Sequence, residues 1–114
     1  MTNIVFYQSN DVNGDPEIQG FVFDGHAGYA EEGSDIVCAA LSVLVINTLN
    51  SIEAFTEDDM EVAEDGETGA IRVDFPDGYG RDTELLLKAL ILGVKQISEN
   101  EDYRSYVSLI FEEV

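Results

Sequence analysis

Hydrophobic residues along the chain fall into short runs and long runs, and this division predicts strands and helices. Five short runs, rich in β-branched and aromatic residues, predict strands at Asn3–Gln8, Glu17–Asp24, Met60–Ala63, Ala70–Phe75 and Ser105–Phe111. Turn-forming sequences join the first two runs (DVNGDP) and the next two (EDGETG). Each of these pairs therefore predicts a β-hairpin.

The two long runs predict helices. DIVCAALSVLVINTLNSIEAF, from Asp35 to about Phe55, has no Gly or Pro and is too long for a strand, and Ser34 is its predicted N-cap. DTELLLKALILGVKQIS, Asp82–Ser98, predicts a second helix with Asp82 as its cap. The resulting order ββαββαβ predicts an α/β (α+β) sandwich, in which both helices pack on a mixed or antiparallel sheet.

Both predicted helices are more apolar than one buried face requires. Apolar residues cover nearly the whole circumference of the first helix between Ile36 and Ile46, and the second carries a similar excess between Leu85 and Leu92. A single sheet cannot bury both surfaces. We therefore expect the helices to pack on each other and the chain to form a symmetric homodimer.

The composition is that of one folded domain spanning residues 1–114, with 45% hydrophobic residues. A single cysteine cannot form an intramolecular disulfide, and no charged segment followed by an apolar segment opens the sequence, which favours the cytoplasm. The longest apolar stretch, Ile36–Ile46, is interrupted by Ser42 and is shorter than the roughly 18 residues that span a bilayer. A soluble protein without a membrane partner is expected.

The charge balance bears on possible partners. The chain has 24 acidic and 5 basic side chains and a formal net charge of −19. This charge repels phosphate backbones and anionic lipids, so no direct nucleic-acid partner is expected. Two interpretations stay open: the carboxylates keep the protein soluble, or they attract a cationic partner or substrate.

Cys38, the only cysteine, lies on the first predicted helix. Asp35 and Ser42 share its helical edge, at spacings of three and four residues. In the predicted first turn, free backbone N–H groups and the helix dipole favour a thiolate, as a nucleophile requires. The alternative is a cysteine that packs as a small buried hydrophobic residue.

His26, the only histidine, follows a predicted strand that ends in Asp24-Gly25. The predicted loop between this histidine and the helix comprises Ala27, Gly28, Tyr29, Ala30, Glu31, Glu32 and Gly33. Its glycines let the loop bend back, bring the imidazole towards the cysteine and act as a substrate gate whose glutamates attract a basic substrate. The alternative is a solvated histidine in an acidic loop.

Other kinds of site are not supported by the sequence. One Cys and one His supply two of the four ligands that a structural zinc site uses, so neither a metal nor a cofactor is expected. The segment that begins DVNGDP resembles a calcium loop at its start but has Pro16 where glycine is needed and Val22 where the closing glutamate is needed. The glycine motifs that bind phosphates are absent from the sequence.

The string GHAGYAEEGSDIVCAALS, Gly25–Ser42, resembles the motif of the ribosomal-processing cysteine protease family, Prp. In that motif Gly-His, a short loop and Asp-Ile-Val-Cys-Ala-Ala followed by Ser recur. Length, acidity and element order also fit, so the resemblance covers essentially the whole chain. It implies a cysteine endopeptidase that removes the N-terminal extension of a large-subunit ribosomal protein, protein twenty-seven, in bacteria such as Firmicutes. It also implies cleavage beside paired phenylalanines, in an extension that continues into a lysine-rich segment.

Carried over by position, the resemblance implies that Cys38 is the nucleophile and His26 its general base. The other recurrent positions of the motif are occupied by Gly25, Asp35 and Ser42. In this interpretation the thiolate attacks the scissile carbonyl, and the histidine protonates the leaving amine. Backbone N–H groups at the helix start, including that of Cys38, would stabilise the oxyanion, while Asp35 would orient His26 or balance its charge.

Two other function classes stay open at this level. One is a non-catalytic binding module or chaperone for a basic ribosomal protein. The other is a thiol-based redox sensor, for which a resolving cysteine is missing from the sequence. Incubation with a peptide that carries the extension separates the protease from both, because only the protease yields two fragments.

Overall fold

The computed structural model describes residues 1–10, 16–25 and 32–114, with residues 32–34 described through their backbone only. The elements in chain order are β1 (Thr2–Asn10), β2 (Pro16–Gly25), α1 (Glu32–Phe55), β3 (Glu61–Glu64), β4 (Ile71–Asp74), α2 (Arg81–Glu99), the short 3-10 helix η1 (Arg104–Tyr106) and β5 (Val107–Glu113). The predicted order ββαββαβ is confirmed for the five strands and two α-helices. The predicted first turn, at residues 11–15, lies outside the described residues.

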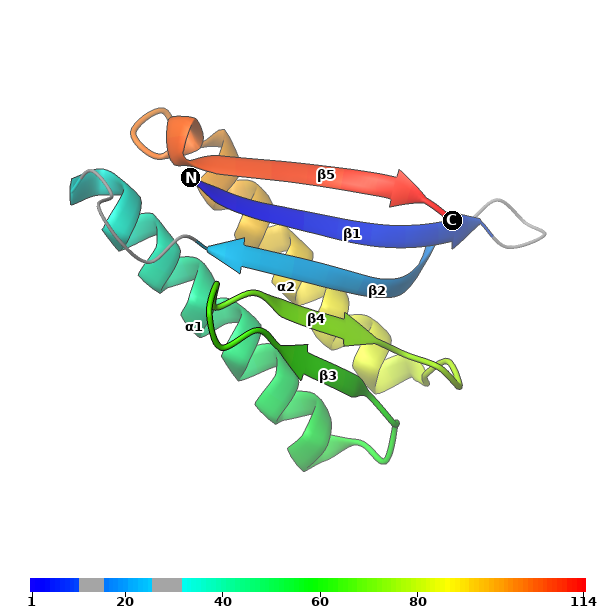
Figure 1. Cartoon of the computed structure of the whole chain (residues 1–114). Helices are drawn as coiled ribbons and strands as arrows, with labels where there is room; N and C mark the ends of the chain where they lie inside the picture. The colour runs from blue at the N-terminus through cyan, green and yellow to red at the C-terminus, as the bar shows by residue number, and fades with distance from the viewer. Residues whose placement is uncertain (11–15, 26–31) are drawn as a thin grey trace.

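The sheet has five strands in the order β3-β4-β2-β1-β5 (Figure 1). β1 pairs with β2 antiparallel and with β5 parallel, and the β2–β4 and β3–β4 pairs are antiparallel. The sheet is therefore mixed, and the predicted fold class, two helices packed on a mixed sheet, is confirmed. β3 and β5 are its two edges.

Alternation along the strands places one row of side chains in the core, between the sheet and the helices. Ile4 and Phe6 of β1, with Phe21 and Phe23 of β2, have exposed fractions of 3% or less. From α1 the buried side chains recur every three or four residues, at Val37, Leu41, Val45, Thr48 and Ile52. Both helices lie on the same side of the sheet (Figure 1). The fold is thus a two-layer sandwich.

The helices also pack on each other, as their apolar excess predicts. A β-carbon at Gly93 of α2 would lie 3.1 Å from Cδ1 of Leu44 on α1, so the missing side chain lets the helices approach closely. Large apolar side chains remain exposed on the outer surface of the helical layer, at Ile36, Val43 and Ile46 of α1 and at Leu85 and Leu92 of α2. This surface is the part of the apolar excess that the fold leaves uncovered.

By length and composition alone, α1 could cross a membrane, since Asp35–Phe55 has a mean hydropathy of 1.7. One helix of this kind is weak evidence, because the core helix of a soluble protein has the same length and composition. In this structure Leu41, Val45 and Ile52 of α1 are buried in the core. The helix is therefore part of the sandwich.

Most predicted strand ends are off by one or two residues, and the predicted caps of both helices were wrong. α1 begins at Glu32, so Ser34 lies inside the helix instead of capping it. α2 begins at Arg81, so Asp82 lies in the first turn and Gly80 occupies the cap position. The last strand begins at Val107, because residues 104–106 form the 3-10 helix η1.

Asp58, in the connection after α1, provides the cap that the sequence analysis assigned to Asp82. Its Oδ2 accepts hydrogen bonds from the backbone N–H of Gly80, at 3.1 Å, and from the hydroxyl of Thr83, at 2.6 Å. Thr83 is fully buried on α2. One carboxylate therefore joins the C-terminal end of α1 to the N-terminal end of α2.

We expect Asp58→Ala to lower the free energy of unfolding by about 1–3 kcal/mol, because it removes the acceptor of the Gly80 N–H and leaves the buried Thr83 hydroxyl only its longer hydrogen bond, of 3.4 Å, to Thr56. Urea denaturation measures this change. Asp59→Ala removes the same charge from the exposed neighbouring position and should change stability by less than about 0.5 kcal/mol. Equal losses in both variants would contradict the capping assignment.

Candidate active site

The end of strand β2 lies against the sulfur of Cys38. A β-carbon at Gly25, the last residue of β2, would lie 2.7 Å from Sγ of Cys38 and 3.2 Å from the ring of Phe23. A real β-carbon does not approach another atom this closely, so glycine is the residue that this position allows. The close packing at Gly25 thus joins the start of α1 to the end of the sheet.

His26 is the next residue in the sequence after Gly25, and it lies outside the described residues. The structure nevertheless brings the strand end that leads into His26 into contact with Cys38. The two residues that the sequence analysis paired are separated by twelve positions in the chain. The contact between Gly25 and Cys38 depends on how β2 packs against α1.

Cys38 is partly exposed and is a free thiol. It packs at the margin of the core, and Ser42 donates a hydrogen bond of 2.7 Å to its backbone carbonyl. The predicted polar edge of α1 is therefore present, but Ser42 contacts the backbone at Cys38 and leaves the sulfur free for other contacts. Asp35, one turn earlier, is exposed.

Cys38 lies one turn further into α1 than the sequence analysis predicted, which placed it in the first turn. Because the helix begins at Glu32, Cys38 is its seventh residue and lies in the second turn. The N–H groups without an intrahelical partner belong to the first four residues of a helix, here residues 32–35. The expectation that the N–H of Cys38 is free to stabilise an oxyanion was wrong for this reason.

The predicted gating loop is shorter than the sequence indicated. Glu32 and Gly33 belong to α1, which removes them from the loop. Ala27, Gly28, Tyr29 and Glu31 lie outside the described residues, together with Ala30. Gating by this segment stays a prediction.

An acidic turn between β3 and β4 approaches the same strand end. Gly69 has a φ of +76°, and a β-carbon there would lie 4.0 Å from the carbonyl oxygen of Gly25. The turn is held by Asp65, whose carboxylate accepts hydrogen bonds from the N–H groups of Glu67 and Thr68, and these bonds lower the pKa of Asp65. The hairpin was predicted, but its proximity to Gly25 depends on strand order and could not be read from the sequence.

Asp24, the residue before Gly25, carries a buried carboxylate oxygen that the sequence analysis did not single out. Its Oδ1 is buried and accepts no hydrogen bond from any described residue. It pairs with Asn3 of β1 and alternates with Gly25, so it lies on the face of the sheet opposite Cys38. Most buried polar atoms in proteins have a partner, so this oxygen is an exception among the described residues.

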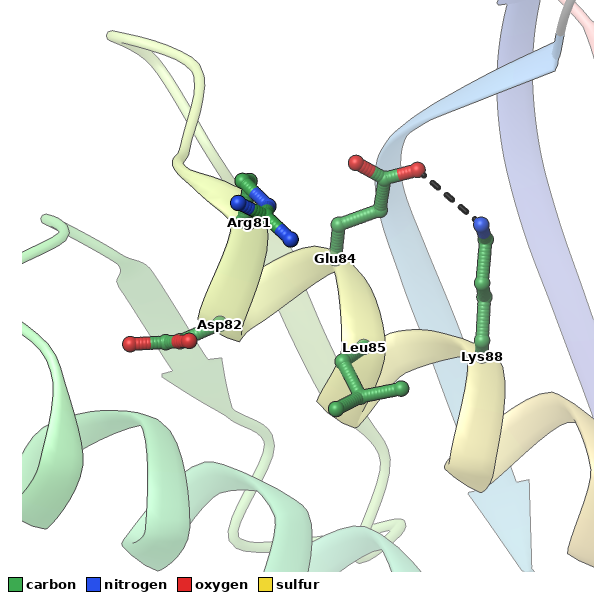
Figure 2. A pocket seen from close by; sticks show the side chains of 5 residues that line it. All are labelled: Arg81, Asp82, Glu84, Leu85 and Lys88. Carbon is green, nitrogen blue, oxygen red and sulfur yellow. Dashed lines mark ion pairs between the residues drawn. The ribbon is translucent and has the colours of Figure 1, made fainter.

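Three cavities of the described part of the chain lie away from Cys38. One of about 630 Å³ lies beside the first turn of α2 (Figure 2), where Lys88 and Glu84 form an ion pair of 3.1 Å.

A second cavity of similar size is lined by α2 and by Tyr79. The hydroxyl of Tyr79 donates a hydrogen bond to the carbonyl of Ile18, and burial raises the pKa of Tyr79 to about 12. The third, about 520 Å³, lies beside the end of α1. Neither Cys38 nor Gly25 lines any of them.

Metal-ligating side chains do not gather near the cysteine either. Within residues 1–10, 16–25 and 32–114, no group of three or more His, Cys, Asp or Glu side chains is placed to hold a metal ion. At the strand end the structure places a partly exposed thiol beside Gly25, the residue that precedes the histidine in the sequence.

Comparison with known proteins places this geometry in a family. Residues 1–108 match the family described as cysteine protease Prp. The chain belongs to the Prp family. Proteins named ribosomal processing cysteine protease Prp from Staphylococcus aureus and Bacillus subtilis are 28% and 29% identical to it, over 82% and 79% of this chain and 90% and 82% of their own lengths.

Solved structures share the fold of this chain. SMU.848 from Streptococcus mutans superposes with a TM-score of 0.83 at 25% identity, covering 100% of this chain and 99% of that one. The S. aureus Prp protease in complex with a substrate peptide shares the fold, with a TM-score of 0.80 at 23% identity over 96% of this chain and 99% of the other. As a Prp protein, this chain is a cysteine protease.

The Gly25 contact gives a prediction for this Prp protein. Gly25→Ala should lower the free energy of unfolding by about 1–3 kcal/mol, because the new methyl group overlaps Cys38 Sγ and the Phe23 ring. In a Cys38→Ala background the sulfur is absent, so the cost of Gly25→Ala should fall by about 1 kcal/mol. Urea denaturation of the four proteins in this cycle measures the coupling.

Gly66→Ala is the matched control for this cycle, because a β-carbon at Gly66 would meet no atom within 4 Å. It should leave stability within about 0.5 kcal/mol of the parent and show no coupling to Cys38→Ala. Additive effects of Gly25→Ala and Cys38→Ala would show that the sulfur does not occupy this position in solution.

Proposed function

We propose that this chain removes the N-terminal extension of a large-subunit ribosomal protein, protein twenty-seven, with Cys38 as nucleophile and His26 as general base. The observation that carries the proposal is the contact between the Cys38 sulfur and Gly25, the residue that precedes His26. Membership of the Prp family supplies the reaction class. The names of the S. aureus and B. subtilis relatives supply ribosomal processing.

The reaction follows the chemistry of a Cys-His pair. His26 takes the thiol proton of Cys38, and the thiolate adds to the scissile carbonyl carbon. The tetrahedral intermediate collapses as His26 returns the proton to the leaving amine, which breaks the C–N bond and leaves a thioester. Water, deprotonated by His26, then attacks the thioester and releases the new carboxylate with the free thiol.

Three further residues of the motif are proposed to position Cys38 or His26. Ser42 holds the backbone carbonyl of Cys38 and so fixes the helical turn that carries the nucleophile. Gly25 leaves the space that the sulfur occupies. Asp35 is exposed one turn before Cys38 and is proposed to orient His26 or balance its charge.

The charge of the protein suits a cationic substrate. Its net charge of −19 attracts a basic ribosomal protein and raises the rate of encounter. The same charge disfavours direct binding to nucleic acid or to an anionic membrane surface. Because ribosomal proteins are made and assembled in the cytoplasm, we place the enzyme there.

Loss of the nucleophile or base gives the direct test. Cys38→Ala, Cys38→Ser and His26→Ala should each lower cleavage of a peptide carrying the extension by about 1000-fold or more, because members of a nucleophile–base pair act as a unit. Mass spectrometry of the products measures cleavage, and circular dichroism checks that each variant folds. Substantial cutting by Cys38→Ala would refute the mechanism. Binding without cutting by the parent protein would identify a non-catalytic binding module instead.

We also propose that the protein is a homodimer joined through its helical layer. Val43 and Leu85 keep 65% and 66% of their surface exposed, on α1 and α2. A symmetric contact between two copies would cover both apolar surfaces. Because each copy carries a charge of −19, repulsion opposes the contact, and salt should strengthen the dimer.

Sedimentation velocity at micromolar concentration tests the dimer. Val43→Glu should shift the protein to monomer, because it places a carboxylate in the centre of the apolar contact. Ile110→Glu adds the same charge at an exposed apolar position of β5, outside the helical layer, and should leave the dimer intact. A parent protein that sediments as a monomer at both low and high salt would exclude the assembly.

A further inference from the structure

Strand β3 is an open edge of the sheet. It pairs with β4 on one side and ends the strand order on the other. All four of its residues, 61–64, are exposed. An edge strand of this kind presents unpaired backbone groups, to which another extended chain can add as a further strand.

The register identifies which backbone groups are free. The N–H of Asp65 donates to the carbonyl of Ala70, at the end of the β3–β4 pairing. In an antiparallel ladder hydrogen-bonded pairs alternate with non-hydrogen-bonded pairs, so the next hydrogen-bonded pairs along β3 and β4 are Ala63↔Arg72 and Glu61↔Asp74. Val62 and Glu64 therefore point their N–H and C=O groups away from β4. Among the described residues, neither receives a hydrogen bond from another element.

This free edge runs towards the candidate active site. β3 leads directly into the acidic turn whose Gly69 lies beside the carbonyl of Gly25 (Figure 1). Gly25 in turn contacts the sulfur of Cys38. A peptide paired with the outer edge of β3 would be separated from β2 by β3 and β4, so it would bind beside the candidate active site and not across it.

The charge around β3 has one sign. Seven of the 24 acidic residues lie between positions 57 and 67, and this segment has no basic residue. These carboxylates repel a second copy of this acidic chain from the edge, yet they favour a strand that carries positive charge. The opposite edge differs, because Lys95 lies over the ring of Phe111 on β5, 5.3 Å from its centre.

We propose that the β3 edge binds a lysine- or arginine-rich, extended peptide segment as an added strand, through the backbone of Val62 and Glu64. The segment forms main-chain hydrogen bonds with the two free positions, and its cations lie beside the carboxylates of this hairpin. In the reaction proposed above, on which this assignment of the occupant rests, the segment belongs to the substrate. Backbone pairing then fixes its direction relative to Cys38.

Hydrogen exchange tests the pairing directly, in the Cys38→Ala protein so that binding is measured without cleavage. The probe is a ten-residue peptide of alternating lysine and threonine. On saturation, the amides of Val62 and Glu64 should exchange about tenfold more slowly, while exposed amides of β5 stay unchanged. Unchanged exchange at both β3 positions, or slowing on β5 in place of β3, would overturn the proposal.

Variants separate backbone pairing from general attraction. Val62→Pro removes one outward N–H while leaving the hydrogen-bonded pairs with β4, and should weaken peptide binding about fivefold relative to Val62→Ala. Glu64→Gln should weaken binding about threefold at low salt, whereas Glu101→Gln, the same change beyond the end of α2, should not. Equal effects of the two glutamine variants would show that the peptide is attracted by the overall charge of the protein, and would contradict the proposal.

The outcomes for binding and for catalysis are independent. Protection at β3 in a protein that cuts no substrate would keep the strand-pairing site and reject the proposed function. Cleavage by the parent protein without protection at β3 would keep the protease and reject the strand-pairing site.

Discussion

The absence of a side chain at Gly25 is the constraint on which the candidate active site depends. The 2.7 Å between Sγ of Cys38 and the position of a Gly25 β-carbon leaves room for a hydrogen atom and nothing larger. Because Gly25 ends β2, the sheet and α1 meet at this point. Any shift of α1 relative to β2 therefore changes the surroundings of Cys38 directly.

The rest of the fold keeps that contact in register. Buried residues along α1, from Val37 to Ile52, fix the rotation of the helix so that Cys38 faces the end of β2. Asp58 ties the far end of α1 to α2, and Gly93 lets α2 approach Leu44 closely. These contacts hold α1 near its start, in its middle and beyond its end, and so keep Cys38 in position beside Gly25.

Periodicity and turn chemistry were enough to predict the element order and the fold class. The start of α2 could not be predicted in this way, because the carboxylate that accepts the N–H of Gly80 belongs to Asp58, 22 residues earlier in the sequence. The orphaned oxygen of Asp24 and the approach of Gly69 to Gly25 depend on strand order and on which face of β2 each residue occupies. Local sequence patterns carry no information on such long-range neighbours.

The parallel pairing of β1 with β5 has a consequence for how the chain acquires its fold. Thr2 of β1 pairs with Val107 of β5, which lies 105 positions later in the sequence. β1 can therefore pair with β2 early, but its second neighbour is missing until β5 has been synthesised. Pairing over such a separation is slow relative to local contacts. A nascent chain therefore carries β1 with one open side through most of its synthesis, and the high acidic charge is well suited to keep that intermediate from associating with other chains.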